Sequence, residues 1–423
     1  MIDMQLLRDD PDLFRVSQGR RKESVELVDE VLALDKLRRE SLTRWEEARA
    51  EQKNQSALFG KEDKREKERL ANELKALAEK VNLLKADADR AEEKWKESAW
   101  QLSNLVSRLA PNGGEDDYKI VEKIGQIRDF EEEGFKPLDH LTLGEKCGGI
   151  DMARGAKVSG ARFYFLTGDI ARLELALEML GLEFGRENGF VPTITPTLVK
   201  PEIMAGTGFL NQHADEIYRL REPDDQYLVG TSEVALAGMH ADEILNLEKP
   251  LKYCGFSTCY RREAGAAGKD THGIIRVHQF NKVEMFVYCK PEESEKIHLE
   301  LLEMEKSMLS KMEIPFRVID IAAGDLGSSA SRKFDCEGWM PTQGRYRELT
   351  STSDCTQYQA RRLSIRYKDG DKNEYCATLN GTLSTTRWLA CILENHQMKD
   401  GRIEIPTSLR PYMGGQEFIL PVL

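Results

Sequence analysis

The sequence lacks membrane-spanning segments and lacks the cysteine spacing typical of zinc sites. No segment approaches the roughly 20 consecutive apolar residues that cross a bilayer. The charged N-terminus has no apolar run of signal-peptide length. Eight cysteines are scattered through the chain without a C-x-x-C pair, which predicts reduced, buried thiols and no zinc. These absences predict a cytoplasmic protein that does not associate with membranes.

Two common nucleotide-binding signatures are also absent. The chain contains neither a G-x-G-x-x-G fingerprint nor a G-x-x-x-x-G-K-[ST] loop, so the usual parallel-sheet nucleotide folds are unsupported. Strand-like segments instead lie at irregular intervals between amphipathic segments at 173–188, 294–312 and 385–397. This pattern predicts an α+β protein, with a mostly antiparallel sheet and flanking helices. The net charge of −12 argues against non-specific nucleic-acid binding over the whole surface, but leaves room for a local basic face.

The first 110 residues are poor in helix-breaking residues. Proline is absent between Pro11 and Pro111, and glycine occurs only at positions 19 and 60. Apolar residues alternate at spacings of four and three, which is the seam of a coiled coil: Leu70, Leu74, Leu77, Val81, Leu84, Ala88, Ala91 and Trp95. A looser helical pattern runs through 27–48, and Phe59-Gly60 offers a break between the two. We therefore predict a long antiparallel two-helix coiled-coil arm over 1–110 and a second domain over 111–423. The basic residues of the arm indicate either a solvated face or one that follows a phosphate backbone.

Residues 259–286 combine arginines, carboxylates and aromatic residues on a predicted strand–loop–strand hairpin. Glycines interrupt the loop, and both flanks are rich in β-forming residues. Guanidinium groups bind anions and an aromatic ring stacks on a planar group. The hairpin therefore predicts a site for an anionic, planar ligand, and a nucleotide fits that description.

Three motifs in order resemble those of class II aminoacyl-tRNA synthetases. The second signature motif of that class is matched by Tyr260-Arg261-Arg262-Glu263 followed by Arg276-Val277-His278-Gln279-Phe280. Residues 189–196 resemble the first motif, which lies at the dimer interface in the family. Residues 381–397, centred on Arg387, resemble the third. Here Thr385-Thr386 replaces the usual glycine-rich approach, and the offset from Asn380 to Arg387 is one residue short.

Within class II, the whole chain resembles the seryl-tRNA synthetases of the bacterial type. The helical hairpin carries this resemblance, together with the short tail: only 36 residues follow Arg387, too few for the further domain that several related synthetases add. The resemblance implies a homodimer that uses ATP to charge tRNA(Ser) with serine, and also tRNA(Sec) where an organism has one. It also implies that the arm grips the long variable arm of the tRNA.

The resemblance further implies the residues of the site. Arg261 and Arg387 would be catalytic, facing the α-phosphate and the γ-phosphate of ATP. The ATP site would comprise Arg261, Arg262, Glu263, Arg276, Val277, Phe280, Glu348, Leu349, Thr350, Ser351 and Arg387. Magnesium would be held by Glu348 and Ser351. The serine site would comprise Thr231, Ser232, Glu233, Arg261, Glu284, Asn380 and Thr382.

Each residue taken singly also has an ordinary structural interpretation. Glu284 is equally consistent with a salt-bridged strand residue, Thr231 with a helix cap, and Phe280 with core packing. Two other functions compete at this stage. One is a synthetase-like ligase that loads an amino acid onto a carrier protein, although known proteins of that kind lack the long arm. The other is a non-enzymatic coiled-coil interaction protein, which would leave the three motifs unexplained.

Overall fold

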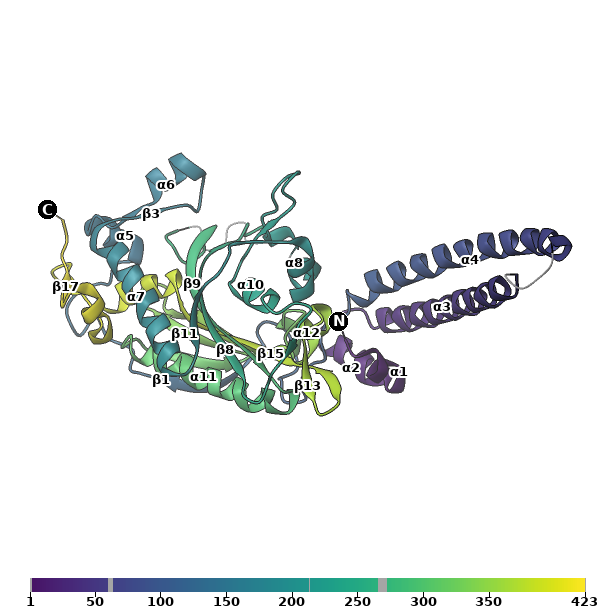
Figure 1. Cartoon of the computed structure of the whole chain (residues 1–423). Coiled ribbons are helices and arrows are strands. Elements are labelled where there is room, and N and C mark those ends of the chain that lie inside the picture. The colour runs from purple at the N-terminus through teal and green to yellow at the C-terminus, as the bar shows by residue number, and fades with distance from the viewer. Residues whose placement is uncertain (1, 60–63, 213, 265–271, 423) are drawn as a thin grey trace. The chain divides into compact units, whose positions relative to one another are not determined.

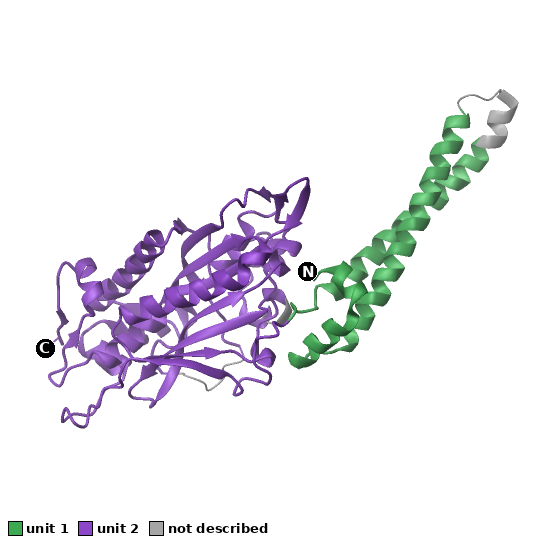
Figure 2. Cartoon of the chain, turned by 90° about the horizontal axis from the view of Figure 1, so that it is seen from below, with its two compact units in different colours: residues 1–105 green, residues 106–423 purple. Residues whose placement is uncertain are grey.

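The computed structural model describes residues 2–59, 64–212, 214–264 and 272–422. The chain forms two compact units, residues 1–105 and residues 106–423, which Figure 2 distinguishes by colour. No helix among the described residues is long and apolar enough to cross a membrane.

The first unit is a helical hairpin preceded by two short helices. Its elements are α1 (Met4–Asp9), α2 (Pro11–Arg20), α3 (Glu26–Phe59) and α4 (Lys64–Ala99). The two long helices, α3 and α4, lie antiparallel along their length (Figure 1). The predicted seam of α4 faces α3, where Leu77, Val81, Ala88, Ala91 and Trp95 are buried. The coiled-coil arm is therefore confirmed, whereas Gly60 of the predicted break and the side chain of Leu70 lie outside the described residues.

A buried carboxylate ties the short helix α1 to the arm. Asp35 of α3 is fully buried and accepts contacts from the guanidinium groups of Arg8, Arg38 and Arg39, each at 3.0 Å. Burial opposes ionisation, but hydrogen bonds from Arg38 and Arg8 outweigh it and lower the pKa of Asp35. Asp35 therefore remains a charged acceptor for three cations from two helices.

Replacing Asp35 by alanine should destabilise the first unit by about 2–3 kcal/mol, because charged hydrogen bonds are lost and their donors stay partly buried. Chemical unfolding of the full chain, followed by far-ultraviolet circular dichroism, measures this change. Asp29→Ala is the matched control, since Asp29 is 63% exposed and pairs only with Arg15 among the described residues. Equal effects of the two substitutions would contradict this role for Asp35.

The second unit is built on an eight-stranded sheet. The strand order is β1-β10-β11-β12-β15-β9-β8-β4, and every neighbouring pair is antiparallel except β4 with β8. The strands are β1 (Lys119–Ile124), β4 (Val191–Ile194), β8 (Leu251–Tyr260), β9 (Gln279–Cys289), β10 (Phe316–Asp320), β11 (Arg332–Met340), β12 (Arg345–Asp354) and β15 (Ala377–Thr385). The predicted α+β class with a mostly antiparallel sheet is confirmed.

Helices and small sheets surround this sheet (Figure 1). The helices are α5 (His140–Lys146), α6 (Met152–Ser159), α7 (Gly168–Glu187), α8 (Pro201–Thr207), α9 (Phe209–Gln212), α10 (Glu233–Gly238), α11 (Ser294–Ser310), α12 (Tyr358–Arg362) and α13 (Thr386–Asn395). The short strands are β2 (Ile150–Asp151), β3 (Phe165–Leu166), β5 (Leu198–Val199), β6 (Tyr227–Leu228), β7 (Ile244–Leu245), β13 (Arg366–Asp369), β14 (Lys372–Tyr375), β16 (Ile403–Glu404) and β17 (Phe418–Ile419).

Strand β9, inside the sheet, contributes side chains to both of its faces. Successive side chains of a strand point to opposite faces. The odd-numbered residues Val283, Met285 and Val287 pack in the main core with residues of α7 and α11. Phe286 and Tyr288 pack on the other face with residues of α10 and α12. The even-numbered face of β9 therefore continues towards Glu284, Lys282 and Phe280, where the sheet is open to a cavity.

Candidate active site

Two adjoining cavities lie over the open face of the sheet within the second unit. They share Arg261, Glu263, Arg276, Lys282, Glu348, Ser351 and Arg387 as lining residues. The larger cavity measures about 430 Å³ and also reaches Thr231, Glu233, Glu284 and Asn380. The smaller one is lined in addition by Val277, Phe280, Leu349, Thr350 and Thr382. Residues from three strands (β9, β12 and β15), two helices (α10 and α13) and the adjoining loops therefore meet at one place, although up to 156 positions separate them in the sequence.

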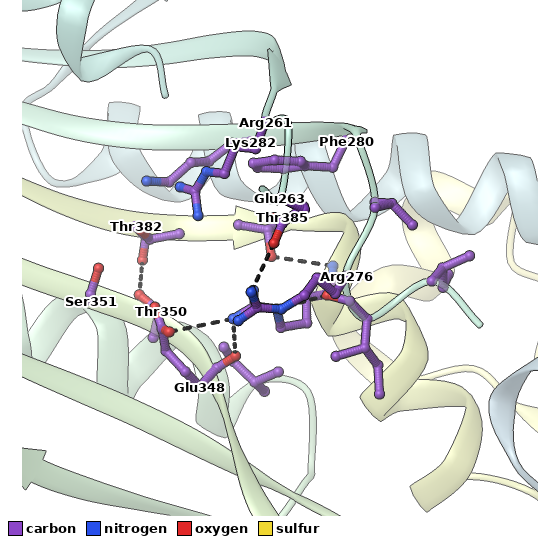
Figure 3. Close-up of a pocket in the computed structure, with 15 residues that line it drawn as sticks. Arg261, Glu263, Arg276, Phe280, Lys282, Glu348, Thr350, Ser351, Thr382 and Thr385 are labelled. Atoms are coloured by element: carbon purple, nitrogen blue, oxygen red, sulfur yellow. Dashed lines mark hydrogen bonds and ion pairs between the residues drawn. The ribbon is translucent and has the colours of Figure 1, made fainter. Parts of the chain in front are cut away.

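Arg261 leaves the end of β8 with its guanidinium group in both cavities. Its backbone is fixed by Nα donating to the carbonyl of His278 at 3.0 Å. The Nε atom donates to the carbonyl of Gly230 at 3.3 Å. The guanidinium carbon lies 5.2 Å from the ring centroid of Phe280, and Figure 3 shows the two side chains together. The described residues give its two terminal nitrogens no hydrogen-bond partner, so they are available to an anion.

Glu263 and Arg276 form an ion pair at the edge of the smaller cavity. Arg276 Nη1 lies 2.8 Å from Glu263 Oε2. Glu263 has a backbone φ of +51°, in the left-handed region that side chains other than glycine seldom adopt. The carboxylate meets Arg276 in the segment that leads into β9. The pair brings together two residues that the family resemblance assigns to the ATP site.

Arg387 and Glu348 make the opposite wall. Arg387 Nη1 donates to the backbone carbonyl of Glu348 at 2.7 Å, and Nε donates to that of Ile275 at 3.2 Å. Nη1 also lies 3.5 Å from Glu348 Oε2. Thr385 caps the first turn of α13 by accepting from the Arg387 N–H at 3.2 Å. The third motif, despite its missing glycines, therefore begins a helix with its arginine facing the cavity.

Glu348 is an ionised carboxylate that opens to the cavity, with 46% of its side-chain surface accessible. Desolvation alone would raise the pKa of this group. The positive charges of Lys333, Arg387 and Arg261 outweigh that effect and lower the pKa of Glu348 to about 2. Burial in turn lowers the pKa of Arg387, which the charge of Glu348 opposes.

The far corner of the larger cavity contains two carboxyl groups. Burial and the neighbouring charge of Glu284 raise the pKa of Glu233 to about 7. Gln359 of α12 donates to Glu233 Oε1 at 2.7 Å. Thr382 donates to Glu284 Oε2 at 3.2 Å, and burial raises the pKa of Glu284 while Lys282 opposes that rise. This corner suits a small ligand that carries hydrogen-bond donors or a positive charge.

Two predicted site residues line neither cavity, and two others are buried at the wall of the smaller one. Ser232 is buried and donates to the carbonyl of Gly255 at 3.0 Å, and it lines neither cavity. Arg262 is exposed and also lines neither cavity. The side chains of Leu349 and Thr350 are buried at the wall of the smaller cavity. Thr350 Oγ1 donates to the carbonyl of Thr382 at 2.6 Å, so it joins β12 to β15 beside the site.

Sequence reasoning missed three residues that bear on the site. Lys282 lies between Phe280 and Glu284 on the same face of β9, and the two-residue period of a strand was the signal for it. Gln359 contacts Glu233 from 126 positions away, and Lys333 is the leading positive charge on Glu348. The sequence held no local signal for either of these two.

Apolar side chains are exposed on the first motif and on the helix before it. Val191 and Ile194 of β4, at the edge of the sheet, are exposed, and Ile194 reaches 84%. Leu175 and Met179, four residues apart on α7, are also exposed. Large exposed apolar side chains gathered on adjoining elements are typical of a protein interface.

The described residues contain no cluster of three or more histidine, cysteine, aspartate or glutamate side chains suited to a metal ion. All eight cysteines are free and buried.

Comparisons with known proteins match both units. The model "Seryl-tRNA synthetase N-terminal domain" matches residues 1–106, and "tRNA synthetase class II core domain (G, H, P, S and T)" matches residues 218–396. The chain is 64% identical over 423 residues to a serine–tRNA ligase of Bifidobacterium animalis subsp. lactis, covering 100% of this chain and 99% of that protein.

Two solved structures are similar over the full chain. A seryl-tRNA synthetase from Pyrococcus horikoshii complexed with ATP is 39% identical, with a TM-score of 0.91 and 100% of both chains covered. A cytoplasmic serine–tRNA ligase from Naegleria fowleri in complex with AMP is 36% identical, with a TM-score of 0.88, covering 100% of this chain and 99% of that one.

Proposed function

The chain belongs to the seryl-tRNA synthetase family, and from this premise we propose which of its residues perform the reaction. Its activity is the ATP-dependent ligation of serine to tRNA, as the full-length similarity to serine–tRNA ligases establishes. The carrier-protein ligase is not favoured, because these relatives match the chain along its whole length, arm included.

One observation supports the assignment of roles: arginines gather next to Phe280, whereas two carboxyl groups lie in one corner of the larger cavity. Arg261, Arg276 and Arg387 line the side next to Phe280. Glu233 and Glu284 line the corner beyond Arg261. An amino acid whose ammonium group enters the corner directs its carboxylate back towards Arg261. ATP on the arginine side would then place its α-phosphate against that carboxylate.

In the first step, a serine carboxylate oxygen attacks the α-phosphorus of ATP. A C–O–P linkage forms, the bond between the α-phosphorus and the bridging oxygen breaks, and pyrophosphate leaves with the electron pair. No protein base is needed, because the carboxylate is already ionised. Arg261 would bind both the serine carboxylate and the α-phosphate, and Arg387 the γ-phosphate. Catalysis therefore rests on orientation and on fixed positive charge.

The nucleotide would occupy the smaller cavity with adenine on Phe280. Arg276 would bind phosphate oxygens, Val277 would line the adenine pocket through its backbone, and Glu263 would accept from the exocyclic amine. Because Glu263 and Arg276 are ion-paired with each other, both would exchange that contact for the nucleotide. Leu349 and Thr350 would form part of the wall of this pocket. The exposed Arg262 would add positive charge at its rim.

Glu348 and Ser351 fit a magnesium ion. Both offer the hard oxygen ligands that Mg²⁺ prefers, Glu348 stays ionised, and both side chains line the cavities. One or two protein ligands suffice when phosphate oxygens and water complete the shell. When bound, the ion would neutralise negative charge on the phosphates.

The serine corner would use four further groups. Thr231 and Glu233 would bind the ammonium group, with Ser232 holding this segment to β8. Glu284 and Thr382 would receive the side-chain hydroxyl, with Asn380 in support. Removing the hydroxyl, as in alanine, leaves buried polar groups unpaired at about 1–3 kcal/mol each, which accounts for its rejection.

In the second step, the 3′-hydroxyl of the terminal adenosine of tRNA attacks the carbonyl carbon of seryl-adenylate. The ester bond forms, the acyl–phosphate bond breaks, and AMP leaves with the electron pair while its phosphate takes up the proton of the hydroxyl. We propose that the arm within residues 1–110 binds the tRNA, which would be tRNA(Ser), and tRNA(Sec) where one exists. A cytoplasmic location accords with supplying charged tRNA for translation.

A homodimer is also part of the proposal. Its support is a set of exposed apolar side chains on α7 and β4: Leu175, Met179, Val191 and Ile194. A second copy of the chain would bury these side chains.

ATP–pyrophosphate exchange with a panel of amino acids tests this function. Serine should support exchange, and alanine and threonine should be weak substrates. Absence of serine-dependent exchange in the purified chain would refute the assignment. Charging of tRNA(Ser) without charging of an acyl carrier protein would then separate the two ligase types.

The KM for serine should depend on pH through Glu233. Its pKa of about 7 means that the group is largely protonated below neutrality and cannot pair with an ammonium ion there. Lys282 and Arg261 favour its ionised form, whereas Glu284 and burial oppose it. Raising the pH from about 6 to about 8 should lower the KM for serine by about 10-fold. Steady-state ATP–pyrophosphate exchange at each pH measures the KM for serine. The KM for ATP is the internal control and should change much less. A serine KM that is flat over this range would contradict the role of Glu233.

A further inference from the structure

We propose that Lys282 is a positioning and specificity residue, which pairs with Glu284 so that one carboxylate oxygen is held and the other is presented to a neutral, hydrogen-bond-donating side chain. The inference rests on the proposed serine corner and adds to it a residue to which no role has yet been given.

Lys282 lies at the junction of the two parts of the site. It stands on β9 between Phe280 and Glu284, all on the face that opens to the cavities. It lines both the nucleotide cavity and the larger cavity. Its side chain is only 9% exposed, and Figure 3 shows it beside Arg261. A lysine so enclosed keeps its charge at low cost only when it is paired.

The contacts of Lys282 fix one oxygen of Glu284. Lys282 Nζ forms an ion pair with Glu284 Oε2, and Thr382 Oγ1 donates to the same oxygen at 3.2 Å. Lys282 Nζ also donates to Thr231 Oγ1 at 3.3 Å. The described residues give Glu284 Oε1 no hydrogen bond. The carboxylate therefore has one satisfied oxygen and one left for a ligand, and Lys282 connects both proposed serine-binding segments.

Among the charges around Glu284, Lys282 does most to keep this carboxylate ionised. Glu284 is buried, and Glu233 of α10 and Glu305 of α11 are further acids near it. Cys254 and Cys259 of β8 lie near it as thiols whose pKa burial raises, so they carry no charge. Burial raises the pKa of Glu284; Lys282 is the foremost opposing influence, ahead of Arg261. Without Lys282, Glu284 would retain a proton or require another cation.

This arrangement selects the ligand by charge. With Lys282 present, the pair is neutral and Oε1 only accepts, so a hydroxyl donor fits and a side-chain ammonium would meet the positive charge of Lys282. With Lys282 neutralised, an ammonium-bearing side chain of similar size would supply the missing charge. 2,3-Diaminopropionate, which is serine with an amine in place of the hydroxyl, is that ligand.

The test is ATP–pyrophosphate exchange by full-length Lys282→Met with serine and with 2,3-diaminopropionate. We expect kcat/KM for serine to fall by about 10–100-fold, since one charged hydrogen-bond partner of a buried carboxylate is lost. The preference for 2,3-diaminopropionate over serine should rise at least about 10-fold, while the KM for ATP changes by less than about threefold. Ethylamine added to Lys282→Ala should restore part of the serine activity, because it returns a cation to the vacated space.

Two variants serve as controls. Lys252→Met removes a lysine of the neighbouring strand β8 that lies near Phe190 and outside the cavities, and it should leave both ratios unchanged. Lys282→Arg keeps the charge and should retain the preference for serine. Equal loss of both substrates without amine rescue, or a change confined to the KM for ATP, would overturn the role of Lys282. Failure of the wild-type chain to exchange with serine would instead refute the proposed function.

Discussion

Replacing Arg261 by alanine should lower kcat/KM for serine-dependent ATP–pyrophosphate exchange by about 10²–10³-fold, the usual effect of removing a fixed donor from a developing charge. Arg261 is held by Gly230 through Nε and by the ring of Phe280. The guanidinium group is therefore oriented before any ligand arrives. Its loss removes a guanidinium group that lines both the proposed nucleotide pocket and the larger cavity with the serine corner.

Arg261→Ala should reduce the rate of exchange more than the stability of the fold. Arg261 forms no ion pair with a described residue, so its removal leaves no buried carboxylate unpaired. Arg261→Lys should recover only a small part of the activity, because an ammonium group cannot bridge two anions as a planar guanidinium does. Single-turnover exchange and thermal unfolding of both variants measure the two effects.

Arg402→Ala is the matched control for Arg261→Ala. Arg402 also pairs through its Nε atom, but with Asp400 on the surface and away from the cavities. Its removal should change exchange by less than about twofold, because surface ion pairs contribute little. A loss below about threefold in Arg261→Ala would argue that another residue stabilises the reacting phosphate.

Periodic features of this fold were predictable from the sequence. The three-and-four spacing of Ala88, Ala91 and Trp95 defines one stripe of a helix, and that stripe is buried against α3. The same holds on β9, where a two-residue period sends Phe280 and Glu284 to one face. Such patterns are local, because the geometry of one element determines them.

Contacts between distant segments were not predictable in this way. Glu305 of α11 accepts from the N–H of Thr382 at 2.8 Å across 77 positions, and Gln359 reaches Glu233 across 126. Both supporting residues are polar residues of helices, and nothing in their neighbourhood distinguishes them from solvent-facing ones. Their role depends on how the helices pack on the sheet. Ser232 is the converse case, since its place in a motif run suggested a ligand contact and its hydroxyl bonds the backbone of β8.

Shortening the arm should separate the two steps of the reaction. Trp45 and Arg38 of α3 face Lys85 and Glu92 of α4, as the 5.3 Å cation–π contact and the 3.1 Å ion pair show. Removing residues 46–84 and joining the ends with a short glycine-rich turn therefore keeps the helices in register. The second unit has its own core, so serine-dependent exchange should stay within about twofold of the full chain.

Transfer to tRNA should behave differently in the shortened chain. If the arm supplies about 4 kcal/mol of tRNA binding, kcat/KM for charging falls by about 10³-fold. A full-length variant with Arg44, Arg49 and Lys53 changed to glutamine is the matched control, since it keeps both helices and removes only charge. Its charging should fall less, and its dependence on salt should become shallower, because fewer phosphates are neutralised. Exchange lost together with charging would show that the arm supports the catalytic unit itself, and undiminished charging would place tRNA recognition on the second unit.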